Sequence, residues 1–431
     1  MAARGEPYNR SLTLRLVWES RRNTQEDGHL DLPGRTLSTA YPIGGDTALS
    51  DLTPIVAPGD FPACRKSVYL NTASVCLMYS GAERAVVEWT HDLAENGTIH
   101  FDEAAEERAF ATLHASAARL FNCRPEEIAV GSSATELLAS LAWAVAPPAG
   151  SNIVSTGLEF PSTVYPWARV ARNTGAEVRL AGMKGDYPMA DDLIGLIDPR
   201  TAVVCVSDVI YSTGQRLDVA GLAEAAHRNG ALLVIDATQS AGGIPIDVGA
   251  LGADALITAS YKWLCGPFGV AVMYLAPHLH ERLEPGLVGF RSHERMWDLR
   301  ADRLKLPPNA HRFEFSTMAY GCAPGLASSI DYLLQLDVGR IFSRNKRLAD
   351  LLIEGLRERN AEILSPTDDG ARSSIVATRF ADTDVRILAE RLNEAGIVVS
   401  ARRNVLRFSP HLYNDADDIQ QALTTIDRCL T

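Results

Sequence analysis

The part of the chain between residues 128 and 273 alternates short apolar segments with stretches of helical periodicity. This alternation is typical of strands that are each followed by a helix, and it predicts a mostly parallel, seven-stranded sheet with helices on both faces. We therefore expect an α/β fold. The predicted strands are residues 128–130, 152–155, 177–180, 202–206, 232–235, 255–257 and 270–273.

The whole sequence divides into four predicted parts. Residues 1–60 have weak periodicity and are expected to form an N-terminal extension. We expect residues 61–90 to contribute to a smaller domain and to the functional site, and residues 91–325 to form the large domain. Residues 326–431 are expected to form a smaller α+β domain at the C-terminus.

Periodicity also predicts the elements outside the large sheet. Helical patterns occupy residues 82–90, 104–121 and 384–395, one long helical stretch starts near residue 327, and a last helix starts near residue 415. The short apolar segments expected to be strands are residues 68–71, 374–378, 397–399 and 405–408.

Composition narrows the class of partner. The net charge of −12 argues against a nucleic acid or an anionic membrane, because both require clustered positive charge. No apolar stretch is long enough for a membrane span and no secretory signal is evident, so we expect a cytoplasmic protein with a small-molecule substrate. The seven cysteines lack CxxC spacing, which favours reduced, buried thiols and argues against a metal site.

Lys262 is the residue with the clearest chemical meaning. It stands between Tyr261 and Trp263, just after one predicted strand, and Asp236 ends the preceding strand. A poorly solvated lysine favours the neutral amine that attacks aldehydes. A lysine and an acid at neighbouring strand ends fit pyridoxal 5'-phosphate (PLP), with Lys262 as the Schiff base and Asp236 on the pyridinium nitrogen. The alternatives are a surface lysine and an aspartate that caps the next helix.

A second motif, Gly131–Glu136, connects a predicted strand to a helix. A turn of small residues at a helix N-terminus presents free N–H groups, and the hydroxyls of Ser133 and Thr135 add donors, so the motif is suited to a phosphate. An ordinary N-cap with Glu136 in the first helical turn explains the same residues equally well.

Three more residues follow predicted strands. Phe160 is placed to cover a flat pyridine ring by stacking, unless it is a core phenylalanine under a loop. Asp208 is placed to reach the phenolic oxygen of the cofactor or the substrate. Gln239 is neutral and is placed to donate a hydrogen bond to that phenolic oxygen.

The order of these motifs resembles the class V aminotransferase family over about residues 66–430. These fold-type I PLP enzymes include cysteine desulfurases, kynureninase-like proteins and isopenicillin N epimerase-like proteins. The resemblance implies that Lys262 binds the cofactor, that Asp236 and Gln239 contact its ring, and that Ala134 and Thr135 lie at its phosphate. Tyr261 takes the place of a residue that usually also reaches the phosphate.

The resemblance also implies a homodimer and a substrate anchor. Thr317 lies in a segment that resembles the family stretch in which a threonine of the neighbouring subunit completes the phosphate site. Arg407 lies in a segment that resembles the substrate-carboxylate segment, where a guanidinium holds a carboxylate with two parallel hydrogen bonds. Asn71 is expected to help hold that carboxylate, and the alternative for Arg407 is a surface arginine on a strand.

Three departures from the family pattern narrow the reaction. Residues 400–404 contain no cysteine, which argues against the persulfide chemistry of cysteine desulfurases. Phe160 stands where those enzymes stack a histidine, so proton transfer should fall to Lys262 or to the substrate. Ala259 and Ser260 replace the serine and glycine that are common in the family, so the phosphate contacts are expected to be rearranged.

The motifs are closest to the isopenicillin N epimerase-like branch, which includes carbon–sulfur lyases of natural-product pathways. We therefore expect β-elimination from an S-substituted cysteine, with Lys262 as the base that takes the Cα proton. Transamination, epimerisation and decarboxylation coupled to oxidative deamination remain alternatives, as does an inactive cofactor-bound scaffold. Five residues expected near the mouth of the site either select a polar substrate or are solvated loop residues; they are Arg291, His293, His311, Arg312 and His411.

Overall fold

The computed structural model of the protein describes residues 52–184 and 187–430. Most of the expected N-terminal extension, residues 1–60, therefore lies outside the described residues. The description that follows concerns the unit Thr47–Thr431, to which all of the described residues belong.

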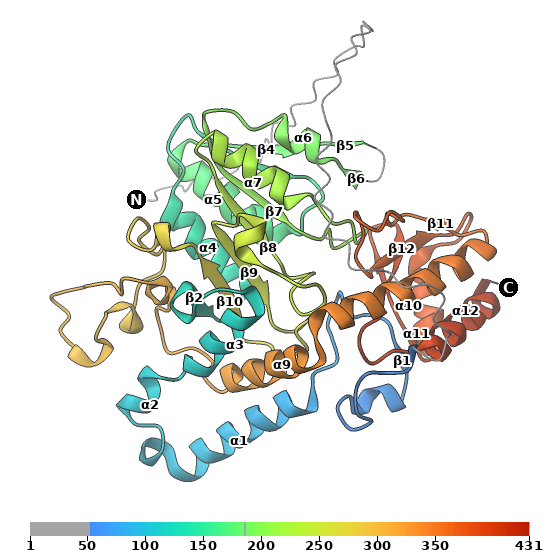
Figure 1. The fold of residues 1–431 in the computed structure, drawn as a ribbon, viewed down its shortest axis with the longest axis horizontal. Helices are drawn as coiled ribbons and strands as arrows, with labels where there is room; N and C mark the ends of the chain where they lie inside the picture. Colours follow the sequence, from blue (N-terminus) through green and yellow to red (C-terminus); the bar gives the residue numbers. More distant parts are fainter. Residues whose placement is uncertain (1–51, 185–186, 431) are drawn as a thin grey trace, which may run out of the picture. The chain divides into compact units, whose positions relative to one another are not determined.

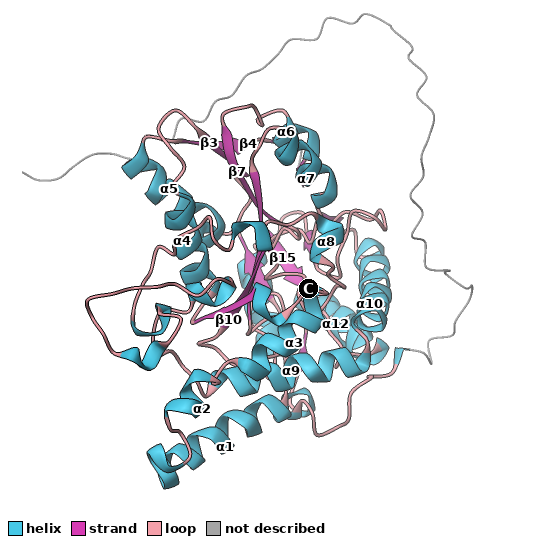
Figure 2. Ribbon diagram, turned by 60° about the vertical axis from the view of Figure 1, so that its left-hand side comes forward, coloured by secondary structure: helices cyan, strands magenta, loops and turns pink. Residues whose placement is uncertain are grey.

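The central element is a seven-stranded sheet with the order β2-β10-β9-β8-β7-β3-β4. Only β10 runs antiparallel to its neighbours, so the sheet is mostly parallel (Figure 2). Each of the seven predicted strands is present, and the predicted α/β fold is confirmed. The strands are β2 (Ile128–Gly131), β3 (Asn152–Thr156), β4 (Glu177–Ala181), β7 (Thr201–Ser207), β8 (Leu232–Asp236), β9 (Ala255–Ala259) and β10 (Ala271–Leu275).

Helices cover both faces of this sheet because its strands are apolar on both sides. In β7, Val203 and Cys205 pack into one core, and Val204 and Val206 pack into another, as the two-residue period of a strand requires. Helices α4 and α5 contribute to the first core, and α3, α7 and α9 contribute to the second (Figures 1 and 2). These helices are α3 (Ala111–Phe121), α4 (Ala134–Val145), α5 (Pro161–Thr174), α7 (Val219–Arg228) and α9 (Cys322–Leu336).

The single helix predicted over residues 104–121 is wrong, because the structure has two helices there, α2 (Glu103–Glu107) and α3. The break has a tertiary cause. Arg291 donates hydrogen bonds to the backbone carbonyls of Glu106 and Glu107, at 2.8 and 3.4 Å, and its guanidinium lies 4.9 Å from the ring centre of Phe110. An arginine distant in the sequence therefore satisfies carbonyls at the end of α2.

The long helical stretch predicted from residue 327 is also interrupted. Helix α9 ends at Leu336, and α10 (Val338–Glu358) begins two residues later. Asp337 between them has a φ of 68°, and its carboxylate accepts a hydrogen bond from the backbone N–H of Gly339 at 2.7 Å. Asp337 thus ends one helix and caps the next.

The C-terminal part has its own four-stranded sheet, with the order β11-β12-β15-β14, and its own core formed with helices α10, α11 and α12. The N-terminal segment joins this part, because β1 pairs in parallel with β13, and Val68 and Leu70 enter its core. Its elements are β1 (Val68–Tyr69), β11 (Glu362–Ile363), β12 (Val376–Arg379), α11 (Val385–Glu394), β13 (Ile397–Val398), β14 (Ser400–Arg402), β15 (Val405–Phe408) and α12 (Ala416–Leu430).

The elements that remain are short, apart from α1. None of the helices in the described ranges combines the length and the apolar character needed to cross a bilayer. Besides short 3₁₀ helices, these elements are α1 (Ser80–Asn96), β5 (Met183–Lys184), β6 (Tyr187–Pro188), α6 (Ala190–Ile194) and α8 (Val248–Leu251).

Candidate active site

A cavity lies where strands of the large sheet end and the next helices begin. Strand β8 ends at Asp236, and β9 ends three residues before Lys262. The space within the cavity, including the part that is open to solvent, is about 500 Å³. It brings together eight of the predicted site residues with four others, and its lining is Ser133, Ala134, Thr135, Phe160, Ser162, Ser207, Asp236, Thr238, Gln239, Ala259, Tyr261 and Lys262.

Asp236 is held in one orientation by a hydrogen bond to each carboxylate oxygen. Thr163 Oγ1 donates to Oδ2 at 2.9 Å, and the backbone N–H of Thr238 donates to Oδ1 at 3.0 Å. The next helix after Asp236 begins only at Val248, so the alternative that Asp236 is a helix cap is wrong. The carboxylate is buried and faces the cavity instead.

We expect Thr163→Val to lower the free energy of unfolding of the apoenzyme by about 1.5–3 kcal/mol, because it removes a hydrogen bond to a buried carboxylate without changing the side-chain outline much. Chemical denaturation measures this loss. Thr163→Ser keeps the hydroxyl and serves as the matched control. Equal stability of the valine and serine variants would show that the hydroxyl does not support Asp236.

Lys262 lies against aromatic rings at the edge of the cavity. Its Nζ is 5.6 Å from the ring centre of Phe160 and 6.0 Å from that of Tyr261. Burial lowers the pKa of Lys262 to about 8; the negative charge of Asp236 opposes this effect, while the positive charges of Arg407 and Arg402 add to it. A substantial fraction of the amine is therefore neutral near pH 8, as nucleophilic attack on an aldehyde requires.

The lowered pKa of Lys262 predicts how cofactor uptake depends on pH. Reaction of the apoenzyme with PLP requires the neutral amine, so the rate should rise as pH increases through about 8 and level off above it. The growth of visible absorbance after mixing measures this rate. A lysine with an ordinary pKa would instead give a rate that keeps rising towards pH 10, and that result would contradict a desolvated Lys262.

Phe160 has 46% of its surface exposed, so the alternative of a core phenylalanine is wrong. It is the residue before the first turn of α5, and one face of its ring is near Lys262. The edge of its ring also meets the ring of Tyr211, with centres 5.6 Å apart and planes at 85°. An aromatic ring is thus held at the cavity where a flat ligand can stack on it.

The first turns of two helices, α4 and α5, together line one end of the cavity. The backbone N–H of Glu136 donates to Ser133 Oγ at 3.2 Å, which confirms the interpretation of Ser133 as an N-cap. Thr135 Oγ1 donates to Ser162 Oγ at 2.9 Å, which connects the two helices. The N–H groups of Ala134 and Thr135 have no acceptor inside the helix because they lie in its first turn. This end therefore fits a phosphate group.

Gln239 lines the cavity, but most of its hydrogen-bonding capacity serves the fold. Its Oε1 accepts from Trp263 Nε1 at 2.9 Å, and its Nε2 donates to the carbonyl of Ala73 at 3.0 Å. The amide nitrogen has one further N–H, which is the group left for a ligand.

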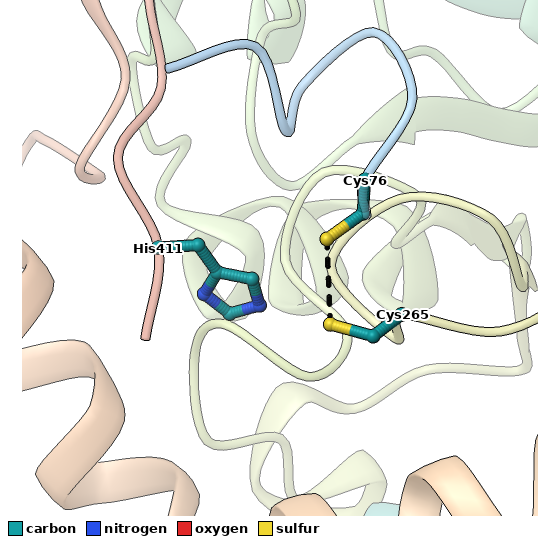
Figure 3. A group of neighbouring side chains, drawn as sticks. All are labelled: Cys76, Cys265 and His411. Carbon is teal, nitrogen blue, oxygen red and sulfur yellow. Dashed lines mark hydrogen bonds between the residues drawn. The ribbon is translucent and has the colours of Figure 1, made fainter. Parts of the chain in front are cut away.

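Cys76, Cys265 and His411 form a cluster of buried sulfur and imidazole groups (Figure 3). Cys76 Sγ and Cys265 Sγ are 3.3 Å apart, and His411 lies beside them. The backbone N–H of Cys76 donates to the carbonyl of Tyr261, and that of Cys265 donates to the carbonyl of Lys262. Burial raises the pKa of the Cys265 thiol well above its usual value, so the thiol stays protonated and packs as an apolar group.

Asp208 and Thr317 do not line this cavity. Asp208 lines a separate hollow beside Arg216, and its Oδ1 is buried with no hydrogen-bond partner among the described residues. Burial raises the pKa of Asp208 to about 6, although a hydrogen bond from Ser240 and the charge of Arg216 oppose the shift. Thr317 is exposed on the loop that precedes α9.

Arg407 is almost fully buried, with 1% of its surface exposed, so the alternative of a surface arginine is wrong. It donates hydrogen bonds to the carbonyl of Tyr211 and to Ser74 Oγ, both at 2.6 Å, and its Nε has no partner among residues 52–184 and 187–430. No carboxylate of the described chain pairs with it. Burial, with a contribution from Arg402, lowers the pKa of Arg407 to about 9. A buried cation without a counter-ion is costly, and a bound anion would offset that cost.

Asn71 has a related feature, because its Oδ1 is buried and has no hydrogen-bond partner in the described part of the chain. The residue forms a parallel bridge with Ser409, two positions after Arg407 on the chain. Asn71 Oδ1 and Arg407 Nε therefore belong to two backbone segments that lie side by side.

The five histidines and arginines expected near the mouth do not line the cavity. Arg312 donates to the carbonyls of Pro307 and Leu283, and Arg291 binds the end of α2, so both arginines hold loops. His311 stacks on His114 with ring centres 4.1 Å apart. The structure therefore does not support the expectation that these five residues select a polar substrate.

Sequence reasoning missed several polar residues of the site. Ser162, Ser207 and Thr238 line the cavity, and Thr163 lies behind Asp236. Glu159 accepts a hydrogen bond from the backbone N–H of Ser207 at 2.8 Å, and burial raises its pKa to about 8. The sequence signal that could have found these residues is their position, because each lies within three residues of a strand end or in the first turn of a helix.

Comparisons with known proteins agree with this arrangement. A model of the family Aminotransferase class-V matches residues 77–422. The uncharacterized aminotransferase YcbU of Bacillus subtilis is 27% identical over 366 residues, which are 85% of this chain and 95% of that protein. A probable cysteine desulfurase of Streptomyces coelicolor is 30% identical over 259 residues, 60% of this chain and 61% of that protein.

A solved structure shares the fold. The apo structure of a cysteine desulfurase from Thermococcus onnurineus NA1 aligns with a TM-score of 0.78 and 23% identity, and it covers 90% of this chain and 99% of that one. With the family match over most of the chain and the lysine, acid and helix N-termini in one cavity, the chain belongs to the class-V aminotransferase family and is a PLP-dependent enzyme.

Proposed function

We propose that the protein catalyses β-elimination from an S-substituted cysteine in natural-product biosynthesis. The observation that carries this proposal is the pair formed by Lys262, an amine with a pKa near 8, and Arg407, a buried guanidinium without a counter-ion. Together they suit an α-amino acid, because Arg407 takes the carboxylate and the amine takes a proton from Cα.

Most of the predicted site residues have a proposed role toward PLP, which accepts the electron pair left when a bond at Cα breaks. Lys262 attaches the cofactor, and Asp236 keeps a proton on its pyridine nitrogen. Phe160 covers the ring. The residues proposed at the phosphate are Ser133, Ala134, Thr135 and Tyr261. Gln239 is proposed at the ring oxygen and Asn71 beside Arg407, whereas Asp208 lines a separate hollow and is given no role at the cofactor.

The small number of groups in the cavity that can accept a proton favours β-elimination over epimerisation. Among the described residues that line the cavity, Lys262 is the one amine, and burial lowers its pKa to about 8. One base is sufficient for β-elimination, because a thiolate leaves without protonation. Epimerisation through two bases would require a second base beside the substrate, and the other ionisable side chains of the cavity lining, Asp236 and Tyr261, are proposed to bind the cofactor. The turn between β14 and β15 contains no cysteine to receive sulfur as a persulfide.

The relative from Streptomyces coelicolor, a probable cysteine desulfurase, supports carbon–sulfur cleavage. The relative from Bacillus subtilis, an uncharacterized aminotransferase, favours transamination as the second candidate, since it also needs one base. We further propose that the enzyme is a cytoplasmic homodimer in which Thr317, exposed on its loop, completes the phosphate site of the partner subunit.

The function is tested with a panel of S-alkyl cysteines and the purified holoenzyme. We expect equal amounts of pyruvate and free thiol. The S-alkyl homocysteines are matched controls, because their sulfur is one carbon further away and cannot leave from Cβ. A keto acid that retains its sulfur substituent would identify an aminotransferase instead, and no product from any member of the panel would refute the elimination.

A further inference from the structure

We propose that the substrate carries a second anionic group in its side chain, bound by Arg402 beside the carboxylate held by Arg407. This inference rests on the proposed function, because it assumes that an α-amino acid occupies the cavity. It adds the chemical class of the side chain, which the reaction type leaves open.

Arg402 and Arg407 project from the same face of one β-hairpin. In the antiparallel pair β14–β15, Ser400 lies opposite Arg407, and Arg402 is two residues further along the same strand. Side chains two positions apart share a face of a strand, so the two arginines are diagonal neighbours. Both guanidinium groups donate to one hydroxyl, Ser74 Oγ, at 2.9 Å from Arg402 and 2.6 Å from Arg407.

Two guanidinium groups on one neutral hydroxyl repel each other. Neither Arg402 nor Arg407 forms an ion pair with any carboxylate in the described parts of the chain, whereas Arg379 and Arg386 of the same C-terminal part are paired with Glu362 and Asp384. The other hydrogen bond of Arg402 goes to the backbone carbonyl of Ala401. An anion with two charged groups would relieve this repulsion, and an anion with one charge would relieve only part of it.

A chain of contacts connects the arginine-bearing face of the hairpin to Lys262. Arg407 binds the carbonyl of Tyr211, whose ring meets Phe160, and Phe160 lies beside Lys262. The positive charges of both arginines also contribute to the lowered pKa of Lys262. Arg407 is buried and Arg402 is exposed, so the α-carboxylate would bind at the inner guanidinium and the second anion at the outer one.

A matched pair of ligands tests the inference, S-carboxymethyl-cysteine and its neutral amide, S-carbamoylmethyl-cysteine. We expect the carboxylate to have at least a 10-fold higher kcat/KM, since a hydrogen bond to a charged group typically contributes about this factor or more. The α-methyl analogues lack the Cα proton and do not react. Their dissociation constants, measured by absorbance titration of the holoenzyme, should show the same preference without turnover.

Arg402→Gln should bring the two dissociation constants close to equal, and Arg402→Lys should keep part of the preference. Arg386→Gln, a change at a surface arginine of α11, is the control and should retain the full preference. Equal constants for the two ligands on the unmodified enzyme, or an undiminished preference in Arg402→Gln, would overturn the inference and leave the elimination intact. Failure of every S-substituted cysteine to bind would overturn the proposed function itself.

Discussion

Lys262→Ala is expected to remove the visible absorbance of the holoenzyme and to lower turnover at least about 1,000-fold. The change deletes the amine that attaches the cofactor and the base proposed to take the Cα proton. No other amine or imidazole lines the cavity within the described residues. Absorbance spectra before and after reconstitution with PLP, followed by assays with S-alkyl cysteines, measure both losses.

Two further variants test whether the loss of the visible band and of activity is due to the amine at position 262. Lys262→Arg keeps a positive charge but cannot attach an aldehyde, so it should lose the visible band as the alanine variant does. Lys305→Ala removes an exposed lysine paired with Glu294 and should keep the band and the activity. A visible band in Lys262→Ala that borohydride fixes to another lysine would mean that the cofactor binds elsewhere.

Arg407→Gln is expected to weaken substrate binding by about 2–5 kcal/mol, which corresponds to roughly 30- to 4,000-fold in KM. The guanidinium is buried, is positioned by Tyr211 and Ser74, and lacks a counter-ion, so the loss should fall mainly on ligands with a carboxylate. Saturation curves with an S-alkyl cysteine and with the corresponding amine, which lacks the carboxylate, separate this effect from general damage.

The matched control for Arg407→Gln is Arg379→Gln. Arg379 lies on the adjacent strand β12, is partly exposed and pairs with Glu362, so its loss should leave KM nearly unchanged. Arg407→Gln should also raise the pKa of Lys262, because one positive charge near the amine is lost. The pH at which cofactor uptake levels off should then move upwards. An unchanged KM in Arg407→Gln would exclude the arginine as the carboxylate anchor.

The fold of the large sheet could be predicted from sequence because its strands are buried on both faces. Val203 to Val206 all pack into cores, so the strand is a continuous apolar run that polar turns interrupt on both sides. The helix breaks at Arg108–Phe110 and Asp337 could not be predicted in the same way. The first depends on Arg291, about 180 residues away in sequence, and the second on a residue that adopts a left-handed backbone conformation.

The part of the candidate site that could be predicted from sequence is the pair Lys262 and Asp236. Lys262 and Asp236 follow consecutive strands of a parallel sheet, so their proximity follows from topology. Arg291, Arg312 and His411 were expected at the mouth of the site and instead hold buried loops. Sequence shows that these side chains are polar, but it does not show which buried backbone carbonyls need a donor.

Sequence alone determined the α/β architecture, the lysine–acid pair and the class of cofactor. Apolar periodicity is a local property that identifies each strand, and in a parallel sheet the residues that follow neighbouring strands lie close together. Only the tertiary structure decided that Arg407 is buried without a counter-ion, that Arg402 shares its hydroxyl acceptor, and that Phe160 is open to the cavity. Burial and charge pairing depend on which distant segments meet, and those contacts form only when the chain has folded.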